Sequence, residues 1–225
     1  MTEPTRISLD GDRHYRIDGN DLPSVTTILG EYEPKQQALE GWKQKTDNWR
    51  QVRDRAALVG TVAHHRILNP YAIRSLPLPD VDMSLVDESV EADVETCEVL
   101  WDSLDFDVGD SPYIEEPVYS HEHGYAGTAD MITTGPNNGA GTIVDLKTSS
   151  AIQDSHRMQV SAYRVACQEM PSLPDPDHGA IIRLDPDPET NPEMTPEVEL
   201  LRPGELDDLF DTFTDLLAKY NSRTR

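Results

Sequence analysis

Residues 142–147 read Thr-Ile-Val-Asp-Leu-Lys, and this stretch decides how the second half of the chain is expected to fold. Ile, Val and Leu indicate a buried β-strand, whereas Asp145 interrupts the apolar run where no solvent-facing residue is expected. Residues two apart on a strand share one face, so the Asp145 carboxylate and the Lys147 ammonium should point the same way. The stretch therefore predicts a strand that carries two charged groups into one site.

Two β-rich runs precede this stretch, and each holds an acid near one end. Residues 113–120 contain Glu115, and residues 125–134 contain Asp130. A Gly-Pro-Asn-Asn-Gly turn signal follows the second run. A hairpin closed by residues 135–140 would bring Asp130 beside the charged pair described above.

The grouping of these acids permits two interpretations. Two or three carboxylates with a backbone carbonyl form the hard-oxygen site that suits Mg²⁺ or Mn²⁺, and Lys147 could then orient a water molecule. The alternative is structural: a buried ion pair between Asp145 and Lys147, with Asp130 in a turn. Residue types alone leave both interpretations open, because acids alone mean little in a sequence this acidic.

Further segments with helix or strand patterns surround the three runs. We expect a short hairpin around the Asp-Gly turn in 6–17, strands at 179–184 and 198–201, and a solvated acidic loop at 186–196. Helices are expected at 25–29, 36–58, 61–68, 85–104, 155–170 and 203–220. Gly60 should separate the second of these helices from the third. This order predicts an α/β fold with a central mixed β-sheet flanked by helices and an N-terminal helical region. One domain should span 1–225, with the helical region at about 20–108 and the α/β core at about 110–225.

The charge of the chain is strongly negative. Its 225 residues include 19 Lys+Arg and 42 Asp+Glu, a net charge of −23, which alone argues against a nucleic-acid partner. There is no apolar run of membrane-spanning length and no apolar signal sequence near the N-terminus, which predicts a cytoplasmic protein without membrane partners. The excess of Asp over Lys favours a halophilic archaeon or its virus as the source, against an ordinary acidic protein.

One segment, residues 35–55, is basic, with a net charge of +3 from six bases and three acids. We expect it to be the DNA-contacting surface if there is one, through the residues Trp42, Lys43, Lys45, Arg50, Arg53 and Arg55. Trp42 and Trp49 are seven residues apart and should share one stripe of a helix. That stripe either packs in the core or presents a surface on which bases stack.

Two other groups have the residue types of a metal site without its spacing. Cys97 and Cys167 are far apart and too few for an iron–sulfur cluster, which needs four ligands. His121 and His123 lie just before Gly124, which favours a solvated turn over a set of ligands.

Five ordered motifs together resemble one known family. They are Gly60-Thr61-Val62-Ala63-His64, Glu115 before Pro117-Val118, Gly127-Thr128-Ala129-Asp130, Asp145-Leu146-Lys147-Thr148-Ser149, and Gln159-Val160-Ser161-Ala162-Tyr163. In this order they resemble the PD-(D/E)XK nuclease superfamily, specifically its RecB-like exonuclease branch. With the Pro23–Leu29 opening, the chain is also similar to the mitochondrial genome-maintenance exonuclease group and phage exonucleases. Ala129 stands where the superfamily's name would place a proline, which the RecB-like branch commonly lacks.

The resemblance implies a role for each matching residue. Asp130, Asp145 and the Leu146 carbonyl would bind one or two Mg²⁺ or Mn²⁺ ions, with help from Glu115, although the neighbouring Glu116 could take that place. His64 would complete the metal site or touch the scissile phosphate. Lys147 would position the attacking water. Gln159 and Tyr163 would orient these groups or the nucleotide.

The activity that this implies is a metal-dependent DNA exonuclease acting on ends or single strands to give 5′-phosphate products. An endonuclease of the same superfamily and a non-catalytic DNA-binding subunit are the alternatives. The expected partners are DNA and a recombination or replication protein, in a monomer or small homo-oligomer.

Overall fold

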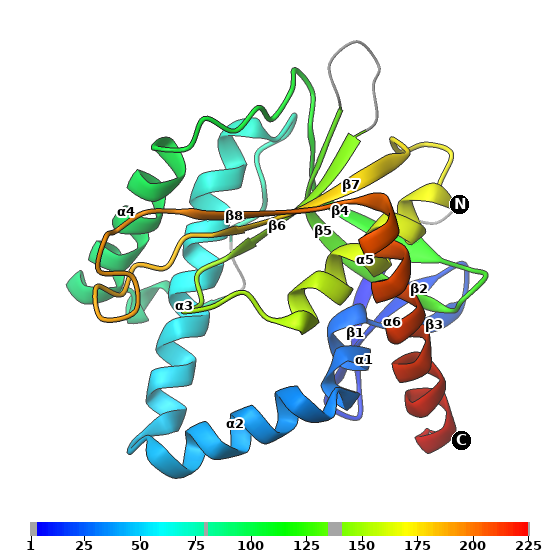
Figure 1. The fold of residues 1–225 in the computed structure, drawn as a ribbon, viewed down its shortest axis with the longest axis horizontal. Coiled ribbons are helices and arrows are strands. Elements are labelled where there is room, and N and C mark those ends of the chain that lie inside the picture. The colour runs from blue at the N-terminus through cyan, green and yellow to red at the C-terminus, as the bar shows by residue number, and fades with distance from the viewer. Residues whose placement is uncertain (1–3, 79–80, 135–140, 225) are drawn as a thin grey trace.

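The computed structural model describes residues 4–78, 81–134 and 141–224, so the predicted turn at 135–140 lies outside the described residues. The expected fold class is confirmed: a five-stranded mixed sheet is flanked by helices, and a small three-stranded sheet and further helices precede it (Figure 1). Within the described residues, no helix combines the length and the apolar character needed to cross a membrane.

The central sheet places the three predicted strands side by side. Its strands, in spatial order, are β4 (Tyr113–Ser120), β5 (Tyr125–Thr133), β6 (Gly141–Lys147), β7 (Pro176–Arg183) and β8 (Glu197–Leu201). All neighbours are antiparallel except β6 and β7, which are parallel. A parallel pair needs a long crossover, and the helix α5 (Asp154–Gln168) supplies it.

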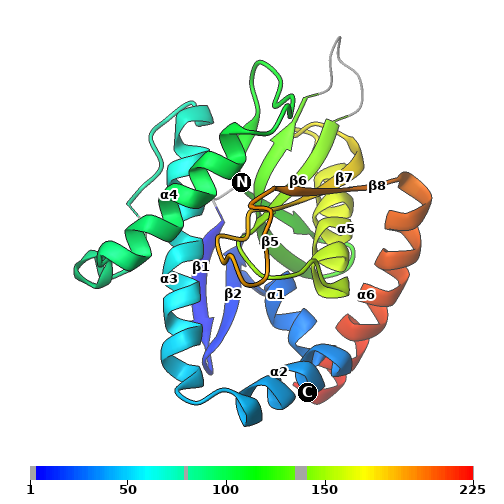
Figure 2. The same ribbon diagram turned by 60° about the vertical axis from the view of Figure 1, so that its left-hand side comes forward.

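Helices cover both faces of this sheet (Figure 2). One apolar core lies between the sheet, α5, α6 (Pro203–Arg223) and α1 (Val25–Ile28), and Ile143 of β6 belongs to it. The other core lies between the sheet, α3 (Trp49–Leu68) and α4 (Glu88–Asp102), and it receives Val144 and Leu146. Successive side chains of β6 therefore point alternately into the two cores, as expected for a strand buried on both faces.

The expected hairpin at the N-terminus is present and gains a third strand. β1 (Thr5–Leu9), β2 (Asp12–Ile17) and β3 (Asn20–Pro23) are antiparallel, and Asp10 and Gly11 make the first turn with positive φ angles of 52° and 89°. Tyr15 and Ile17 are buried against Ala126 of β5. The small sheet is thereby attached to the central one.

The expected boundaries of the long N-terminal helices are wrong. Helix α2 (Glu33–Lys45) ends before Asn48, whose left-handed φ of +58° turns the chain, and α3 then runs without interruption through Gly60. Trp42 and Trp49 therefore lie on different helices and do not form one stripe. Gly60 does not end a helix; a Cβ at this position would lie 3.1 Å from Thr148 Oγ1, so the glycine lets α3 approach the segment after β6.

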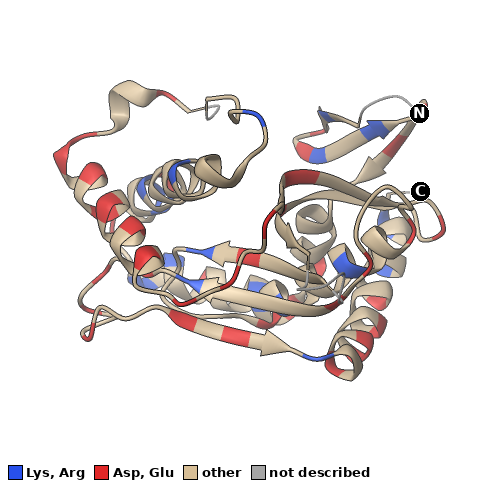
Figure 3. Ribbon diagram, turned by 90° about the horizontal axis from the view of Figure 1, so that it is seen from above, with Lys and Arg blue, Asp and Glu red and all other residues tan. Residues whose placement is uncertain are grey.

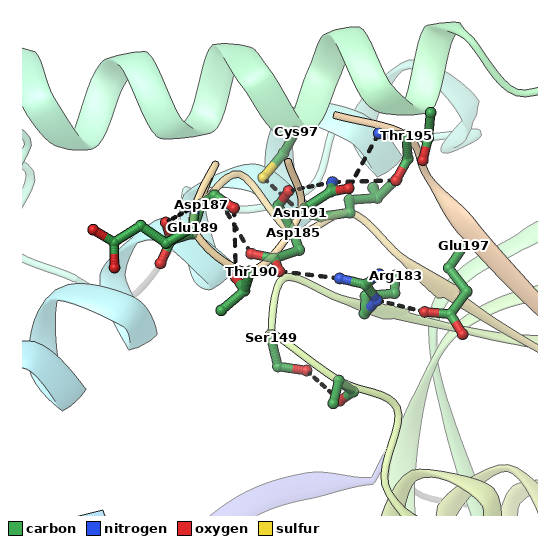
Figure 4. A network of polar contacts seen from close by, with 12 residues as sticks. Cys97, Ser149, Arg183, Asp185, Asp187, Glu189, Thr190, Asn191, Thr195 and Glu197 are labelled. Carbon is green, nitrogen blue, oxygen red and sulfur yellow. Dashed lines mark hydrogen bonds and ion pairs between the residues drawn. The ribbon is translucent and has the colours of Figure 1, made fainter. Parts of the chain in front are cut away.

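The acidic loop between β7 and β8 is anchored by buried polar groups, in contrast to the solvated loop that its composition predicts (Figure 4). Asp185 is 2% exposed and Asn191 5% exposed. The Asn191 side chain donates to the backbone carbonyls of Asp185 and Thr195 at 2.9 and 3.1 Å, and accepts the Thr195 N–H at 3.2 Å. Asp185 also accepts from Arg183 at 3.0 Å, which ties the loop to β7.

We expect Asn191→Ala to lower the free energy of unfolding by about 1–3 kcal/mol, because it leaves buried backbone groups without partners. Urea unfolding followed by circular dichroism measures the change. Glu189→Ala in the same loop is the control, since this side chain is exposed, and it should shift stability by less than about 0.5 kcal/mol. Equal stability of the two variants would show that the Asn191 side chain does not hold the loop.

Candidate functional site

The site forms where β5 separates from β6. Their ladder ends at the pair Met131 and Val144, and the next residues in register would be Asp130 and Asp145. The Asp130 side chain reaches across instead, and its Oδ2 accepts the Leu146 N–H at 2.8 Å. The Asp130 carboxylate thus replaces a backbone carbonyl as the acceptor for this N–H. The two strands diverge beyond this point, and Asp130 and Asp145 lie at the opening.

Three potential metal ligands meet at this opening. Ligand atoms of His64 from α3, Glu115 from β4 and Asp130 from β5 all lie within 4.8 Å of one another. His64 Nδ1 is 3.6 Å from Asp130 Oδ2. All three side chains come from the predicted set, and it is Glu115 rather than Glu116 that joins the group.

Glu115 reaches the group through an unusual backbone conformation. Ile114 pairs with Met131 and Glu116 with Ala129, so Glu115 lies opposite Asp130 across the ladder. Its φ is +50°, in the left-handed region that non-glycine residues seldom occupy, and such residues concentrate at functional sites. The residue with the strained backbone is therefore one of the three potential metal ligands.

Asp145 and Lys147 form a second group beside the ligands. Lys147 Nζ lies 2.5 Å from Asp145 Oδ2, as expected for two residues on one face of a strand. Gln159 Nε2 on α5 donates to Asp145 Oδ1 at 2.9 Å and contacts the Tyr163 hydroxyl at 3.3 Å. Gln159 therefore holds Asp145 by a direct hydrogen bond, and Tyr163 contacts Gln159. Neither residue is one of the three potential metal ligands.

Gly127 is needed to seat Tyr163. A Cβ at position 127 would lie 2.3 Å from Tyr163 Cε1, so the ring packs directly on the backbone of β5. This contact explains why a glycine stands at position 127, the first residue of the Gly127–Asp130 motif.

Burial is the main cause of the pKa shifts of two carboxyl groups at the site, and the Asp130 carboxylate adds to both. Burial and then the Asp130 carboxylate raise the pKa of Glu115 to about 7, against the opposing effect of Arg13 and Arg6. Burial also raises the pKa of Asp145 to about 7, although Lys147 opposes the shift. Both carboxyl groups resist ionisation, and a cation bound in this position would stabilise their ionised forms.

The basic groups are in the forms that such a site requires. Burial lowers the pKa of Lys147, but its ion pair with Asp145 and the charge of the Asp130 carboxylate outweigh this, so the pKa lies above its usual value and the ammonium stays charged. Burial lowers the pKa of His64, despite the opposing effects of Asp130 and of a hydrogen bond to the Leu146 backbone. His64 is therefore neutral near pH 7, the form of imidazole that binds metals.

The predicted DNA-contacting residues lie apart from the ligands, around one indole ring. Lys43, Arg50 and Arg53 place their charges 5.0, 4.5 and 5.4 Å from the centre of the Trp49 ring. Trp49 and Trp42 are both half-buried rather than core residues. The structure thus groups these cations on Trp49, one of the two tryptophans for which the sequence left a core position and a base-stacking surface both open.

Two members of the predicted DNA-contacting set differ from the others. Arg55 forms an ion pair with Asp93 of α4 at 2.6 Å, so its charge is directed towards that helix. Lys45, at the end of α2, is exposed and forms no ion pair with a residue that the structure describes.

The histidine turn behaves largely as predicted. His123 lies in the turn between β4 and β5, although Glu122, His123 and Glu169 have ligand atoms within 4.8 Å of one another. Glu169 already accepts hydrogen bonds from Ser120 Oγ and the Glu122 N–H. These contacts fasten the hairpin to the end of α5 and explain the grouping without an ion.

Sequence reasoning missed three cations that act on the site: Arg6, Arg13 and Lys35. The pKa of Glu115 responds to both arginines, and the pKa of Lys35 responds to Lys147. The only advance signal is the alternation in β2, which puts Arg13 on the same face as the buried Tyr15.

Comparison with known proteins does not identify a family. No protein-family model matches the chain, and no curated protein matches its sequence.

We expect Glu115→Gln to stabilise the metal-free protein increasingly between pH 5 and pH 8. Wild-type Glu115 has a folded pKa of about 7 against an ordinary 4.5, so its ionisation costs stability progressively as the pH rises through this window. The gain should reach roughly 1–3 kcal/mol at pH 8 and nearly vanish at pH 4. Thermal unfolding in EDTA measures it.

Added Mn²⁺ should reverse the order, stabilising the wild type more than Glu115→Gln, because bound metal raises stability only where ligands are intact. Glu95→Gln, at an exposed position on α4, is the control and should follow the wild type throughout. A Glu115→Gln protein with the same pH profile and Mn²⁺ response as wild type would remove Glu115 from the site.

Proposed function

We propose that the protein is a divalent-metal-dependent deoxyribonuclease of the PD-(D/E)XK superfamily, related to its RecB-like branch. The observation that carries this proposal is the meeting of His64, Glu115 and Asp130 beside the Asp145–Lys147 pair. A purely structural ion pair would account for Asp145 and Lys147. It would not account for three further potential ligands, one of them held in a left-handed conformation.

The residues present fit Mg²⁺ or Mn²⁺. Glu115 and Asp130 offer carboxylate oxygens, and His64 offers a neutral ring nitrogen; the pKa of Glu115 is elevated by burial first and by the Asp130 carboxylate second, and a bound cation would oppose both effects. Asp145 could join them once Lys147 turns from its carboxylate to the substrate. When bound, such an ion lowers the pKa of a water and offsets phosphate charge.

The side chains of this chain have separable tasks in phosphodiester hydrolysis. Lys147, a charged ammonium within a buried acidic group, would hold the attacking water and offset the charge that develops on phosphorus. Asp145 keeps Lys147 in place, and Gln159 fixes the orientation of Asp145. Products would carry 5′-phosphate and 3′-hydroxyl ends.

The exonuclease form of the proposal draws support from α2 and α3. Figure 1 shows α2 running across one side of the molecule from α1 to the far end of α3. The cations on Trp49 lie at the junction of α2 and α3, where they could contact a strand that leaves the site. An endonuclease with the same site is the second candidate.

Lys147→Ala should reduce cleavage of an end-labelled single strand in Mn²⁺ by at least about 100-fold. The reason is that the Asp145 carboxylate would lose its cation and the water its donor. Gel analysis of 5′- and 3′-labelled oligonucleotides gives the rate and the polarity. Lys219→Ala, at a cation on α6 paired with Glu33, is the matched control and should cut at the wild-type rate. Equal rates for both variants would contradict the mechanism.

A closed single-stranded circle separates the two nuclease candidates. An exonuclease needs an end, so the circle should survive an amount of enzyme that degrades the linear form completely. Efficient cutting of the circle would establish the endonuclease instead.

Replacing Arg50 and Arg53 with Ala should weaken single-strand binding and reduce its salt dependence by about 0.7 for each phosphate that the variant no longer neutralises. Fluorescence anisotropy over a KCl series measures both. The Mn²⁺-induced thermal shift should stay as in wild type, since these residues lie about three to four turns before His64 on α3 and form no contact with the potential ligands. Parallel weakening of DNA and Mn²⁺ binding would indicate damage to the fold.

A further inference from the structure

Most Lys and Arg side chains of this acidic protein are neutralised by a neighbouring acid. Within the part of the chain that the structure describes, the cations that form no ion pair are Arg6, Arg13, Lys35, Lys45, Arg50, Arg74 and Arg202. Acidic positions dominate the outer helices α4 and α6 (Figure 3). Three of the free cations, Arg6, Arg13 and Lys35, act on the candidate site.

Arg6 and Arg13 project from one face of the small N-terminal sheet. Arg6 lies directly opposite Tyr15 in the ladder, and Arg13 is two residues before Tyr15 on β2, so all three share a face. That face meets the central sheet, because the Tyr15 hydroxyl is 2.9 Å from Thr128 Oγ1, two residues before Asp130. Both arginines are exposed, and both oppose the rise in the pKa of Glu115.

Lys35 approaches the other end of the site. The Tyr32 hydroxyl donates to Asp154 Oδ2 at 3.1 Å, which joins the start of α2 to the start of α5, and Lys35 follows one turn later. Burial and then the Lys147 ammonium lower the pKa of Lys35, so the two amines are within electrostatic reach of each other. Lys147 ends β6 shortly before α5 begins, so the Tyr32–Asp154 contact at the start of α5 places Lys35 on the β6 side of the site.

His156 adds a neutral donor beside these amines. Its Nδ1 accepts the Gln153 N–H at 3.2 Å, which leaves the proton on Nε2. Burial, followed by Lys147, Lys35 and Arg157, lowers the pKa of His156 to about 3, so the ring stays neutral. An uncharged N–H donor next to Lys35 suits a phosphate oxygen.

The two sets of groups lie on either side of β5. The face of the small sheet that carries Arg6 and Arg13 is on the side of β4 and Glu115, whereas Lys35 is on the side of β6 and Lys147, and β5 with Asp130 lies between them. A phosphate at the ligands would therefore have free cations on both sides.

We propose that Arg6 with Arg13, and Lys35 with His156, form two phosphate subsites that bind the linkages on either side of the scissile one in a single DNA strand. This inference rests on the proposed nuclease function and deepens it, since it assigns the N-terminal sheet to substrate binding. It also implies that the site takes one strand, which would be bound through the scissile phosphate and at least one phosphate on each side of it.

The first test needs no cleavage. Affinity for a short single strand is measured in EDTA over a KCl series for wild type, Arg6→Ala/Arg13→Ala and Lys35→Gln. The slope of log affinity against log salt should fall by up to about 1.4 for the double variant and about 0.7 for Lys35→Gln. Arg16→Ala is the matched control, because Arg16 lies on the opposite face of β2 and pairs with Asp21; its slope should equal that of wild type.

The second test locates the subsites. One phosphate of the strand is replaced by a neutral methylphosphonate, which is moved along the sequence while cleavage is followed in Mn²⁺. Wild type should be slowed at least about 5-fold by a neutral group on either side of the cut linkage. The arginine variant should become insensitive to one of these positions and Lys35→Gln to the other.

The outcomes separate this inference from the nuclease proposal. Unchanged salt slopes, or both variants insensitive to the same linkage, would overturn the two subsites while leaving the nuclease proposal intact. A wild type that never cuts, combined with the expected decrease in slope, would overturn the nuclease and keep the phosphate contacts.

Discussion

The separation of β5 from β6 after Met131 and Val144 is the constraint on which the site depends. A continued ladder would have placed Asp130 and Asp145 in register as two buried acids with no space between them. By using its side chain to accept the Leu146 N–H, Asp130 satisfies the backbone and lets the strands diverge. Glu115, on the other side of β5, has a left-handed backbone conformation, and its carboxylate lies at the same opening.

Two glycines permit the close approaches that position the helices beside this opening. Gly127 admits the Tyr163 ring onto β5, and Gly60 admits α3, with His64 one turn later, onto the segment after β6. In both cases a Cβ would meet a neighbouring atom at 3.1 Å or less. The two glycines thus set the positions of a helix that supports the site and a helix that contributes a ligand.

The strand period and the i, i+4 spacing are local, so the sequence predicted the α/β sheet and two pairs of side chains at the candidate site; His64 was placed there only by the family resemblance. Asp145 with Lys147, and Gln159 with Tyr163, are near neighbours whose geometry follows from strand and helix repeats. The helix break at Asn48 was missed since a single left-handed residue leaves no periodic trace. Arg6, Arg13 and Lys35 were missed because only the tertiary packing of the small sheet and of α2 brings them to the site.

The charge of −23 acquires a different meaning once its distribution is known. Acids on the outer helices repel DNA only over the Debye length, which shrinks to about 3 Å in molar salt. The contacts that survive such screening are short ones, and the free cations nearest the ligands are placed to make them. Since most other Lys and Arg side chains are neutralised by neighbouring acids, DNA would find few competing sites on this surface. Under the proposed function, an acidic protein would in this way bind an acidic polymer at one place: the negative surface would discourage binding elsewhere, and the unpaired cations would select the strand position at which the phosphate meets the ligands.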